Sequence, residues 1–212
     1  MKKYIILISI IITSCSTRKI EEKIVKDFII EKKIKSNSSA TPCFLIMEAE
    51  SNENTLSFYE MSFLDKNLEL GEKSYIFSPR NFSNWPIDID EIKTLDSISK
   101  KDSNPYYWDT KMSQIIKFQI IKRKEFSTKI NKLIIPISSS GHILSKPILS
   151  LNKKYAFFSY SIIFSSSGST KEVFLVKKEN GKWKIMASFI KNYDYLPPSW
   201  RGINSQNASA SF

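Results

Sequence analysis

The chain has 212 residues, of which 42% are hydrophobic and 25% are charged, and its formal net charge at pH 7 is +11. This composition is typical of a globular protein that can bury a core, so it excludes general disorder. The length suits one domain of good size or two small ones.

The first residues have the order of an export signal. Lys2 and Lys3 provide a positive start, residues 4–12 form an almost unbroken apolar run, and small residues precede Cys15. A secretory signal has this order of charge, apolar core and small-residue cleavage site. The apolar run is too short to span a bilayer, which requires about 20 such residues. We therefore predict that residues 1–14 are an export signal rather than a permanent transmembrane helix.

The segment Ile12-Thr13-Ser14-Cys15 resembles the lipobox of bacterial lipoproteins, in which Leu, a small residue, and Gly or Ala precede the cysteine. Ile in place of Leu, and Ser in place of Gly or Ala, depart from that pattern. The resemblance implies a diacylglyceryl group on the Cys15 sulfur, cleavage before Cys15, and acylation of the new amino terminus with a fatty acid such as palmitate. Two or three acyl chains give a stable anchor, since each buried methylene contributes about 0.8 kcal/mol.

The implied location is the cell envelope, with the protein anchored by lipid on the periplasmic or cell-surface side of a membrane. An ordinary signal peptide with a coincidental cysteine is the alternative. Lipidation of Cys15 would leave Cys43 as the remaining cysteine, so we expect no internal disulfide even in an oxidising compartment. Cys43 lies in an apolar run, which predicts a buried and inert thiol.

Residues 15–41 are predicted to form the lipidated N-terminus, a helix and a linker. The helix is expected over about 19–35, and a Ser-rich stretch over 36–42 ends it. Its apolar stripe is expected to pack on the following domain rather than lie on the membrane. The stripe consists of Ile20, Ile24, Val25, Phe28 and Ile29.

Residues 43–77 have the pattern of strands. An apolar run over 44–47 predicts the first strand, and alternation of apolar and polar residues over 56–61 predicts the second. Residues 51–54 would form the turn between them. A short apolar run over 75–77 predicts a third strand.

A helix is predicted over residues 86–101. Asp88 can accept hydrogen bonds at its N-terminus, and Glu91 follows three residues later, as a capping box requires. The aromatic residues 106–108 show no secondary-structure period. Residues 115–121 are predicted to form another strand.

The last third of the chain has the clearest pattern. A long strand over 155–164 is followed by a loop over 165–169 and a strand over 172–178. Asn180-Gly181 is a strong hairpin signal, because both residues tolerate the positive φ that a tight turn requires. The chain returns as a strand over 182–190. We predict a three-stranded antiparallel meander with one buried face.

The hairpin over residues 178–185 resembles the closing hairpin of small exported bacterial domains, including cystatin-like and NTF2-like α+β folds. In those folds a helix packs in the concave face of a curved antiparallel sheet. Residues 145–183 also resemble exported bacterial proteins of unassigned function. The resemblance implies one α+β domain over 42–201, with the N-terminal helix packed on a curved antiparallel sheet. The polar tail over 202–212 is predicted to be disordered.

Residue counts exclude several kinds of catalytic site. The five glycines are too widely spaced to form G-x-G-x-x-G, a P-loop or G-x-S-x-G. One histidine and two distant cysteines provide neither a two-histidine zinc site nor C-x-x-C. We predict no metal and no cofactor, and nucleic-acid binding is not expected of an exported lipoprotein.

Two candidate catalytic groups remain. His142 would be the base of any Ser-His-Asp arrangement, but its polar surroundings over 138–142 predict a solvated loop residue. Asp88, Asp90 and Glu91 could act as paired carboxylates in glycoside hydrolysis. A helix cap already accounts for Asp88 and Glu91.

Aromatic side chains provide the candidate binding residues. Trp85, Tyr106, Tyr107, Trp108 and Trp200 could line a sugar-binding or peptide-binding cleft. Core or rim packing in a sheet protein is the alternative for each of them.

The lysines occur in pairs spread along the chain, such as Lys100-Lys101 and Lys153-Lys154. A basic exported protein could lie against anionic lipid headgroups or polyanions outside the cell. Spread charges also serve simply to solvate a surface.

These patterns favour an envelope lipoprotein that is a non-catalytic binding or interaction module. Its partners would be the membrane, through lipid on Cys15, and a protein, glycan or small apolar ligand bound on the concave face of the sheet. The alternatives are a carboxylate-based hydrolase of envelope polymers, and an immunity or inhibitor protein that binds a toxin or an enzyme.

Overall fold

The computed structural model describes residues 2–34, 37–38, 41–69, 72–79, 82, 85–102, 104–116, 118–164 and 170–191. For residues 2–16, 37–38, 41, 115 and 170, only the backbone is described. The predictions for the loop over 165–169, for Trp200 and for the tail over 202–212 lie outside the described residues. The side chain of Cys15 lies outside them as well.

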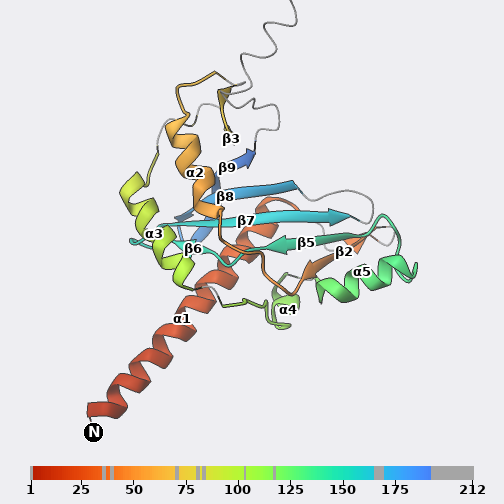
Figure 1. Cartoon of the computed structure of the whole chain (residues 1–212). Coiled ribbons are helices and arrows are strands. Elements are labelled where there is room, and N and C mark those ends of the chain that lie inside the picture. The colour runs from red at the N-terminus through yellow and green to blue at the C-terminus, as the bar shows by residue number, and fades with distance from the viewer. Residues whose placement is uncertain are drawn as a thin grey trace, which may run out of the picture.

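Among the described elements, helices and strands are interspersed up to α5, and the elements that follow α5 are all strands (Figure 1). The helices are α1 (Lys2–Glu31), α2 (Thr55–Leu64), α3 (Ile89–Lys101), α4 (Met112–Ile116) and α5 (Arg123–Asn131). The strands are β1 (Asn37–Ser38), β2 (Thr41–Ile46), β3 (Tyr75–Ser78), β4 (Gln119–Ile121), β5 (Ser140–Leu144), β6 (Ile148–Leu149), β7 (Tyr155–Phe164), β8 (Thr170–Glu179) and β9 (Lys182–Lys191).

The strands form a mixed, largely antiparallel sheet with the order β4-β2-β5-β7-β8-β9-β3. β2 runs parallel to β4 and β5, and the other pairs are antiparallel. β1 pairs with β2, and β6 pairs with the start of β7. The α+β fold with an N-terminal helix and a C-terminal meander is therefore confirmed, while the parallel pairs were not predicted.

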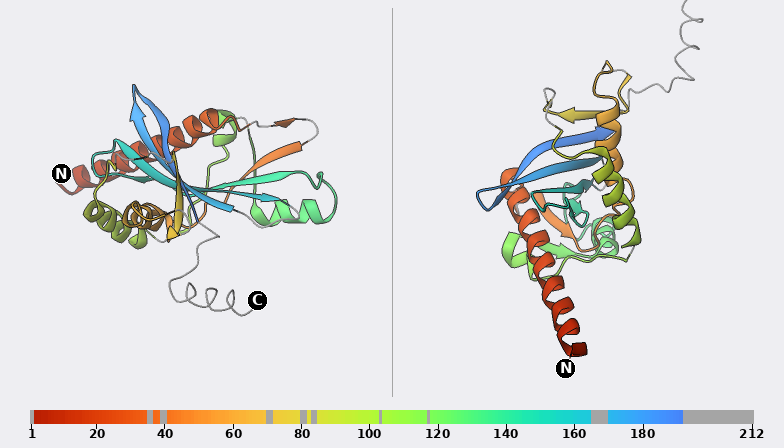
Figure 2. Two further views of the ribbon diagram at one scale, coloured as in Figure 1. Left: turned by 90° about the horizontal axis from the view of Figure 1, so that it is seen from above. Right: turned by 90° about the vertical axis from the view of Figure 1, so that its left-hand side faces the viewer.

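α1 packs on one face of the sheet, and α2 and α3 cover the opposite face (Figure 2). The predicted apolar stripe forms this contact, with Ile24, Val25 and Phe28 almost fully buried. The Phe28 ring lies 4.8 Å from the rings of Phe158 and Phe174, centroid to centroid. α1 ends at Glu31, several residues before the predicted end.

Side-chain carboxylates of α1 also bond the edge of β9. The backbone N–H of Trp183 donates to Asp27 Oδ2 at 2.9 Å, and that of Ile185 donates to Glu31 Oε2 at 2.8 Å. β3 pairs only with residues 188–191 of β9, so the earlier part of β9 has no neighbouring strand on that side. The carboxylates of α1 therefore accept from backbone N–H groups that would otherwise be unpaired at a strand edge. Helix and sheet are thus joined by both apolar packing and hydrogen bonds.

The predicted hairpin is confirmed, but the prediction of one buried face is wrong, because α1 covers one face of the sheet and α2 and α3 cover the other. Asn180 and Gly181 have φ values of 49° and 75°, as the turn requires. A register shift opposite Leu175 and Val176 adds a residue to β9. Side chains alternate along a strand, so one extra residue exchanges the faces. Trp183 consequently packs beneath α1, whereas Phe189 packs on the side of α2 and α3.

Residues 56–61 form part of a helix, so the predicted second strand is wrong. The buried side chains of α2 recur three to four residues apart, which is the helical period. They are Thr55, Leu56, Phe58, Tyr59 and Ser62. Leu56 and Phe58 are also two residues apart, which is the spacing of apolar residues in a strand. This spacing led to the wrong prediction.

The predicted strand over 115–121 is only partly correct. Its first two residues end α4, and only residues 119–121 pair with β2. The basic helix α5 follows immediately, and the sequence analysis missed it. Phe126 and Ile130 of α5 pack beneath β2 and β5, against Phe44 among others.

Replacing Phe28 with Ala should destabilise the protein strongly. The ring is 1% exposed and contacts three aromatic rings, so its loss leaves a cavity that costs about 3–5 kcal/mol of unfolding free energy. Ile30→Ala on the same helix is the matched control, because Ile30 is 64% exposed. Urea unfolding of the two variants measures the difference. Equal losses would contradict the packing described for α1.

Candidate functional site

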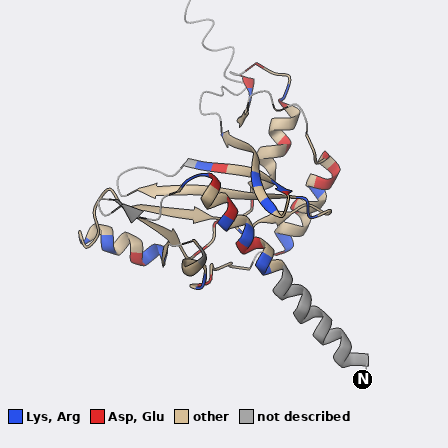
Figure 3. Cartoon of the chain, turned by 180° about the vertical axis from the view of Figure 1, so that it is seen from behind, with Lys and Arg blue, Asp and Glu red and all other residues tan. Residues whose placement is uncertain are grey.

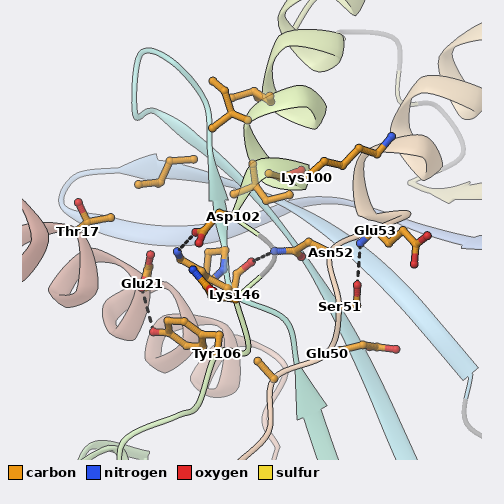
Figure 4. A pocket seen from close by; sticks show the side chains of 18 of the residues that line it. Thr17, Glu21, Glu50, Ser51, Asn52, Glu53, Lys100, Asp102, Tyr106 and Lys146 are labelled. Carbon is orange, nitrogen blue, oxygen red and sulfur yellow. Dashed lines mark hydrogen bonds and ion pairs between the residues drawn. The ribbon is translucent and has the colours of Figure 1, made fainter.

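An open cleft of about 820 Å³ lies where α1, the C-terminal end of α3 and β6 meet (Figure 4). Thr17 and Glu21 of α1 form one side, and residues 49–53 form another. Side chains from 95–106 and 146–153 complete it. We call this the α1–α3 cleft. Its walls come from four segments far apart in the sequence, so it exists only in the folded chain.

Polar groups of the cleft bond one another across these segments. Lys146 Nζ lies 2.6 Å from Asp102 Oδ2, and the Lys146 carbonyl accepts a hydrogen bond from Asn52 Nδ2 at 2.7 Å. The Tyr106 hydroxyl donates to Glu21 Oε2 at 3.0 Å. Lys146 Nζ also stands 5.6 Å from the centroid of the Tyr106 ring. These bonds hold the polar wall in one arrangement before any ligand arrives.

Glu21 is a buried acid at the edge of this cleft, with 3% of its surface exposed. Burial raises its pKa above the ordinary range, although the Tyr106 hydroxyl and the positive charge of Lys146 oppose that rise. Burial and the neighbouring Glu21 also raise the pKa of Tyr106. The carboxyl of Glu21 and the hydroxyl of Tyr106 therefore both release their protons less readily than they would in water.

The opposite wall of the cleft is aliphatic. Leu95 is buried, and Ile148 and Leu149 are half-buried. Ile98 and Leu151 lie at the mouth and are 54% and 61% exposed. Ligand sites commonly combine apolar walls with a few fixed polar groups. This arrangement suits a molecule with an apolar side and a polar side.

The segment over residues 49–53 is fixed to the sheet through Glu50. Its carboxylate accepts hydrogen bonds from the hydroxyls of Ser159 at 3.2 Å and Ser161 at 3.0 Å. The Glu50 backbone N–H donates to the Leu144 carbonyl at 3.1 Å. The wall formed by residues 49–53 is therefore anchored to β7 and β5.

The structure disperses the four predicted aromatic binding residues. Tyr106 lines the cleft, whereas Tyr107 is 54% exposed and outside it. Trp108 is buried in the core beneath α1, and its Nε1 donates to the Leu144 carbonyl at 3.2 Å. Trp85 belongs to the aromatic cluster on the other face of the sheet, with Tyr59 and Phe189 among its neighbours.

His142 lies in a buried strand, so its prediction as a solvated loop residue is wrong. Residues 140–144 form β5 between β2 and β7, where the paired backbones outweigh the turn preference of the serine run. His142 Nδ1 lies 2.7 Å from the Tyr160 hydroxyl, and Nε2 lies 3.2 Å from Ser140 Oγ. Burial lowers the pKa of His142 to about 4. The ring is a neutral, hydrogen-bonded part of the core.

Cys43 stands at the end of the same network. It is half-buried rather than buried as predicted, and its sulfur accepts a hydrogen bond from Ser140 Oγ at 3.3 Å. Ser140 thus lies between the thiol and the imidazole. The network joins β2, β5 and β7 side by side.

Asp88 and Glu91 serve structural roles, and Asp90 lies in the first turn of α3. Asp88 is the N-cap of α3 and accepts from the backbone N–H of Glu91 at 2.7 Å. The Glu91 side chain accepts instead from the N–H of Leu151 at 2.8 Å, so the reciprocal half of the predicted capping box is replaced by a tertiary contact. Among the described residues, no group of three or more acidic, histidine or cysteine side chains is placed to hold a metal ion.

Sequence reasoning missed Glu21, Asp102 and Lys146 as a cluster. One signal was available, because Glu21 precedes Val25 by four residues and Phe28 by seven, which places an acid on the apolar face of the helix. Asp102 and Lys146 carry no comparable local signal, since their meeting depends on the paths of α3 and β6.

No helix in the described part of the chain is both long enough and apolar enough to cross a bilayer. No protein-family model matches the chain, and neither the curated proteins nor the solved structures contain a significant match.

Replacing Tyr106 with Phe should cost about 1–3 kcal/mol of unfolding free energy, because it leaves the buried Glu21 carboxyl without its donor. Tyr107→Phe is the matched control, since that side chain is exposed and its loss should change stability by no more than about 0.5 kcal/mol. Chemical unfolding of both variants measures the difference. An unchanged Tyr106→Phe protein would contradict the burial of this pair.

The buried His142 should make the protein less stable in mild acid. Its pKa is lower in the folded chain than in the unfolded chain, so the unfolded state binds the additional proton as the pH falls below about 6.5. We expect the unfolding free energy to fall by about 2 kcal/mol between pH 7.5 and pH 5 through this group alone. His142→Gln should lose that component of the pH dependence. Identical pH profiles for the two proteins would refute the assignment.

Proposed function

We propose that the chain is a lipid-anchored binding module of the cell envelope, with Cys15 as the lipidated residue and the α1–α3 cleft as its ligand site. The observation that carries the proposal is the position of the cleft. Its wall includes Thr17, which is two residues beyond Cys15 on the same continuous helix. A ligand in the cleft would therefore be held directly beside the membrane.

The contacts within the cleft favour binding over hydrolysis. Three of its four acidic side chains already serve as structural partners: Glu21 bonds Tyr106, Asp102 pairs with Lys146, and Glu50 accepts from two serines of β7. Glycoside hydrolysis requires two carboxyl groups that face the scissile bond from opposite sides. Carboxyl groups that already bond neighbouring segments of the fold are poorly placed to act as the acid and base of glycoside hydrolysis.

Helices cover both faces of the sheet, so neither face is open as the binding surface predicted from the sequence. The cleft at the end of α1 is the accessible alternative. Its aliphatic and polar walls favour a ligand that has both characters, such as an amphiphile or a glycan with an apolar face. An immunity or inhibitor role has no specific observation in its favour.

Replacing Cys15 with Ala should abolish incorporation of a clickable fatty acid and release the protein from the membrane fraction. Two acyl chains give stable anchoring, which the variant would lack. Cys43→Ala is the matched control and should retain both label and membrane association. An unlabelled wild-type chain, or equal labelling of the Cys15→Ala variant, would contradict the proposed anchor.

The cleft is tested in the same cells with a photo-reactive phenylalanine analogue. Placed at Leu149 inside the cleft it should form adducts, whereas placed at Leu133, an exposed residue after α5 that does not line the cleft, it should not. Lys146→Ala should reduce the adducts formed at Leu149, since it removes a polar group of the site. Adducts of equal yield at both positions, or none at Leu149, would refute the assignment of the cleft.

A further inference from the structure

Two exposed segments at the mouth of the cleft share one composition. The C-terminal end of α3 presents Ile98 with Lys100 and Lys101, and the turn between β6 and β7 presents Leu151 with Lys153 and Lys154. We call these six residues the anchor-side rim. Each segment combines one exposed aliphatic side chain with two exposed lysines.

The two segments of the rim are fixed relative to each other. The backbone N–H of Leu151 donates to the Glu91 carboxylate at 2.8 Å, which joins the turn to α3. Glu91 and Ile98 are seven residues apart on α3, so they lie on the same side of the helix two turns from each other. The rim is a preformed surface rather than two independent loops.

The rim surrounds the same cleft as Thr17, and this places it near the proposed anchor. Ile98, Lys100, Leu151 and Lys153 line the cleft together with Thr17. A helix rises 1.5 Å per residue, so Thr17 is only about 3 Å along the axis from Cys15. Arg18 already contacts Asp109, at 3.7 Å. The segment between Cys15 and the first residues that contact the domain is therefore too short to act as a flexible linker.

We propose that the anchor-side rim docks on the membrane surface, with its lysines against anionic lipid headgroups and with Ile98 and Leu151 dipping into the interface. This inference rests on the proposed lipid anchor at Cys15. Lysine near an anionic surface is attracted to it, and aliphatic side chains bury their apolar surface among the headgroups. Lys100 is paired with Asp96 at 2.6 Å, so Lys101, Lys153 and Lys154 should contribute most of the attraction.

Basic segments lie close to the proposed anchor. Figure 3 shows Lys and Arg segments, with acidic segments among them, where α1 meets the rest of the domain. A second exposed aliphatic group, Leu133 and Ile134 beside Lys132, follows α5 at the opposite end of the molecule from the start of α1 (Figure 1). It has a similar composition but is remote from the anchor, and so it provides a matched control.

The test uses the full chain, expressed with its own leader and reconstituted into vesicles of phosphatidylcholine with phosphatidylglycerol. In a Cys43→Ser background, a fluorophore is attached to a cysteine introduced by Leu151→Cys or by Leu133→Cys. Brominated lipids should quench the fluorophore at position 151 and leave the one at 133 unchanged. Replacing Lys101, Lys153 and Lys154 with Glu should weaken docking about fivefold or more for each lysine. That effect should vanish in vesicles of phosphatidylcholine alone.

Quenching at neither position, at both equally, or at 133 alone would overturn the docking surface. The intact mass of the same sample separates this inference from the proposed function. If Cys15 is lipidated but the fluorophore at position 151 is not quenched, the proposed lipid anchor is supported and the docking of the anchor-side rim is refuted. A mass without lipid would refute the anchor, and with it the rim inference, which rests on that anchor.

Discussion

The packing of α1 on the sheet is the contact on which the rest of the structure depends. Phe28 inserts between the rings of Phe158, Tyr160 and Phe174, at centroid distances of 4.8–5.3 Å. Burying an aromatic side chain of this size contributes several kcal/mol, which is a large part of the stability of a typical domain. α1 is therefore a structural part of the domain and not a flexible tether that precedes it.

That packing has consequences at both ends of the helix. Toward its C-terminus, Asp27 and Glu31 satisfy the backbone of β9 and complete the sheet edge. Toward its N-terminus, Glu21 and Thr17 become one wall of the α1–α3 cleft. If Cys15 carries lipid, the position of the cleft relative to the membrane follows from helix geometry, because no linker separates the two.

Sequence patterns predicted the parts of the fold that depend on neighbours along the chain. The Asn180-Gly181 turn, the Asp88 cap and the stripe containing Ile24 and Phe28 all obey local rules, and the structure confirms each of them. Predictions from the sequence were wrong where pairing with distant strands determines the local structure. The serine run before His142 favours a turn by composition, yet two neighbouring strands hold it as β5.

The candidate site was less predictable than the fold, for the same reason. Of the predicted aromatic residues only Tyr106 lines the cleft, and its partner Glu21 was not predicted as a site residue. The bulge that moves Trp183 and Phe189 to opposite faces carries no sequence signal that we recognise. Sites built from segments over a hundred residues apart require the fold before their members can be named.

Amide hydrogen exchange on the membrane-bound protein tests the central claim most directly. If α1 is an integral part of the core from the anchor onward, amides over residues 21–31 should exchange as slowly as those of β8, at rates set by global unfolding. Rapid exchange over residues 21–31, with protection retained in β8, would show that the helix is a detachable tether and would contradict the account.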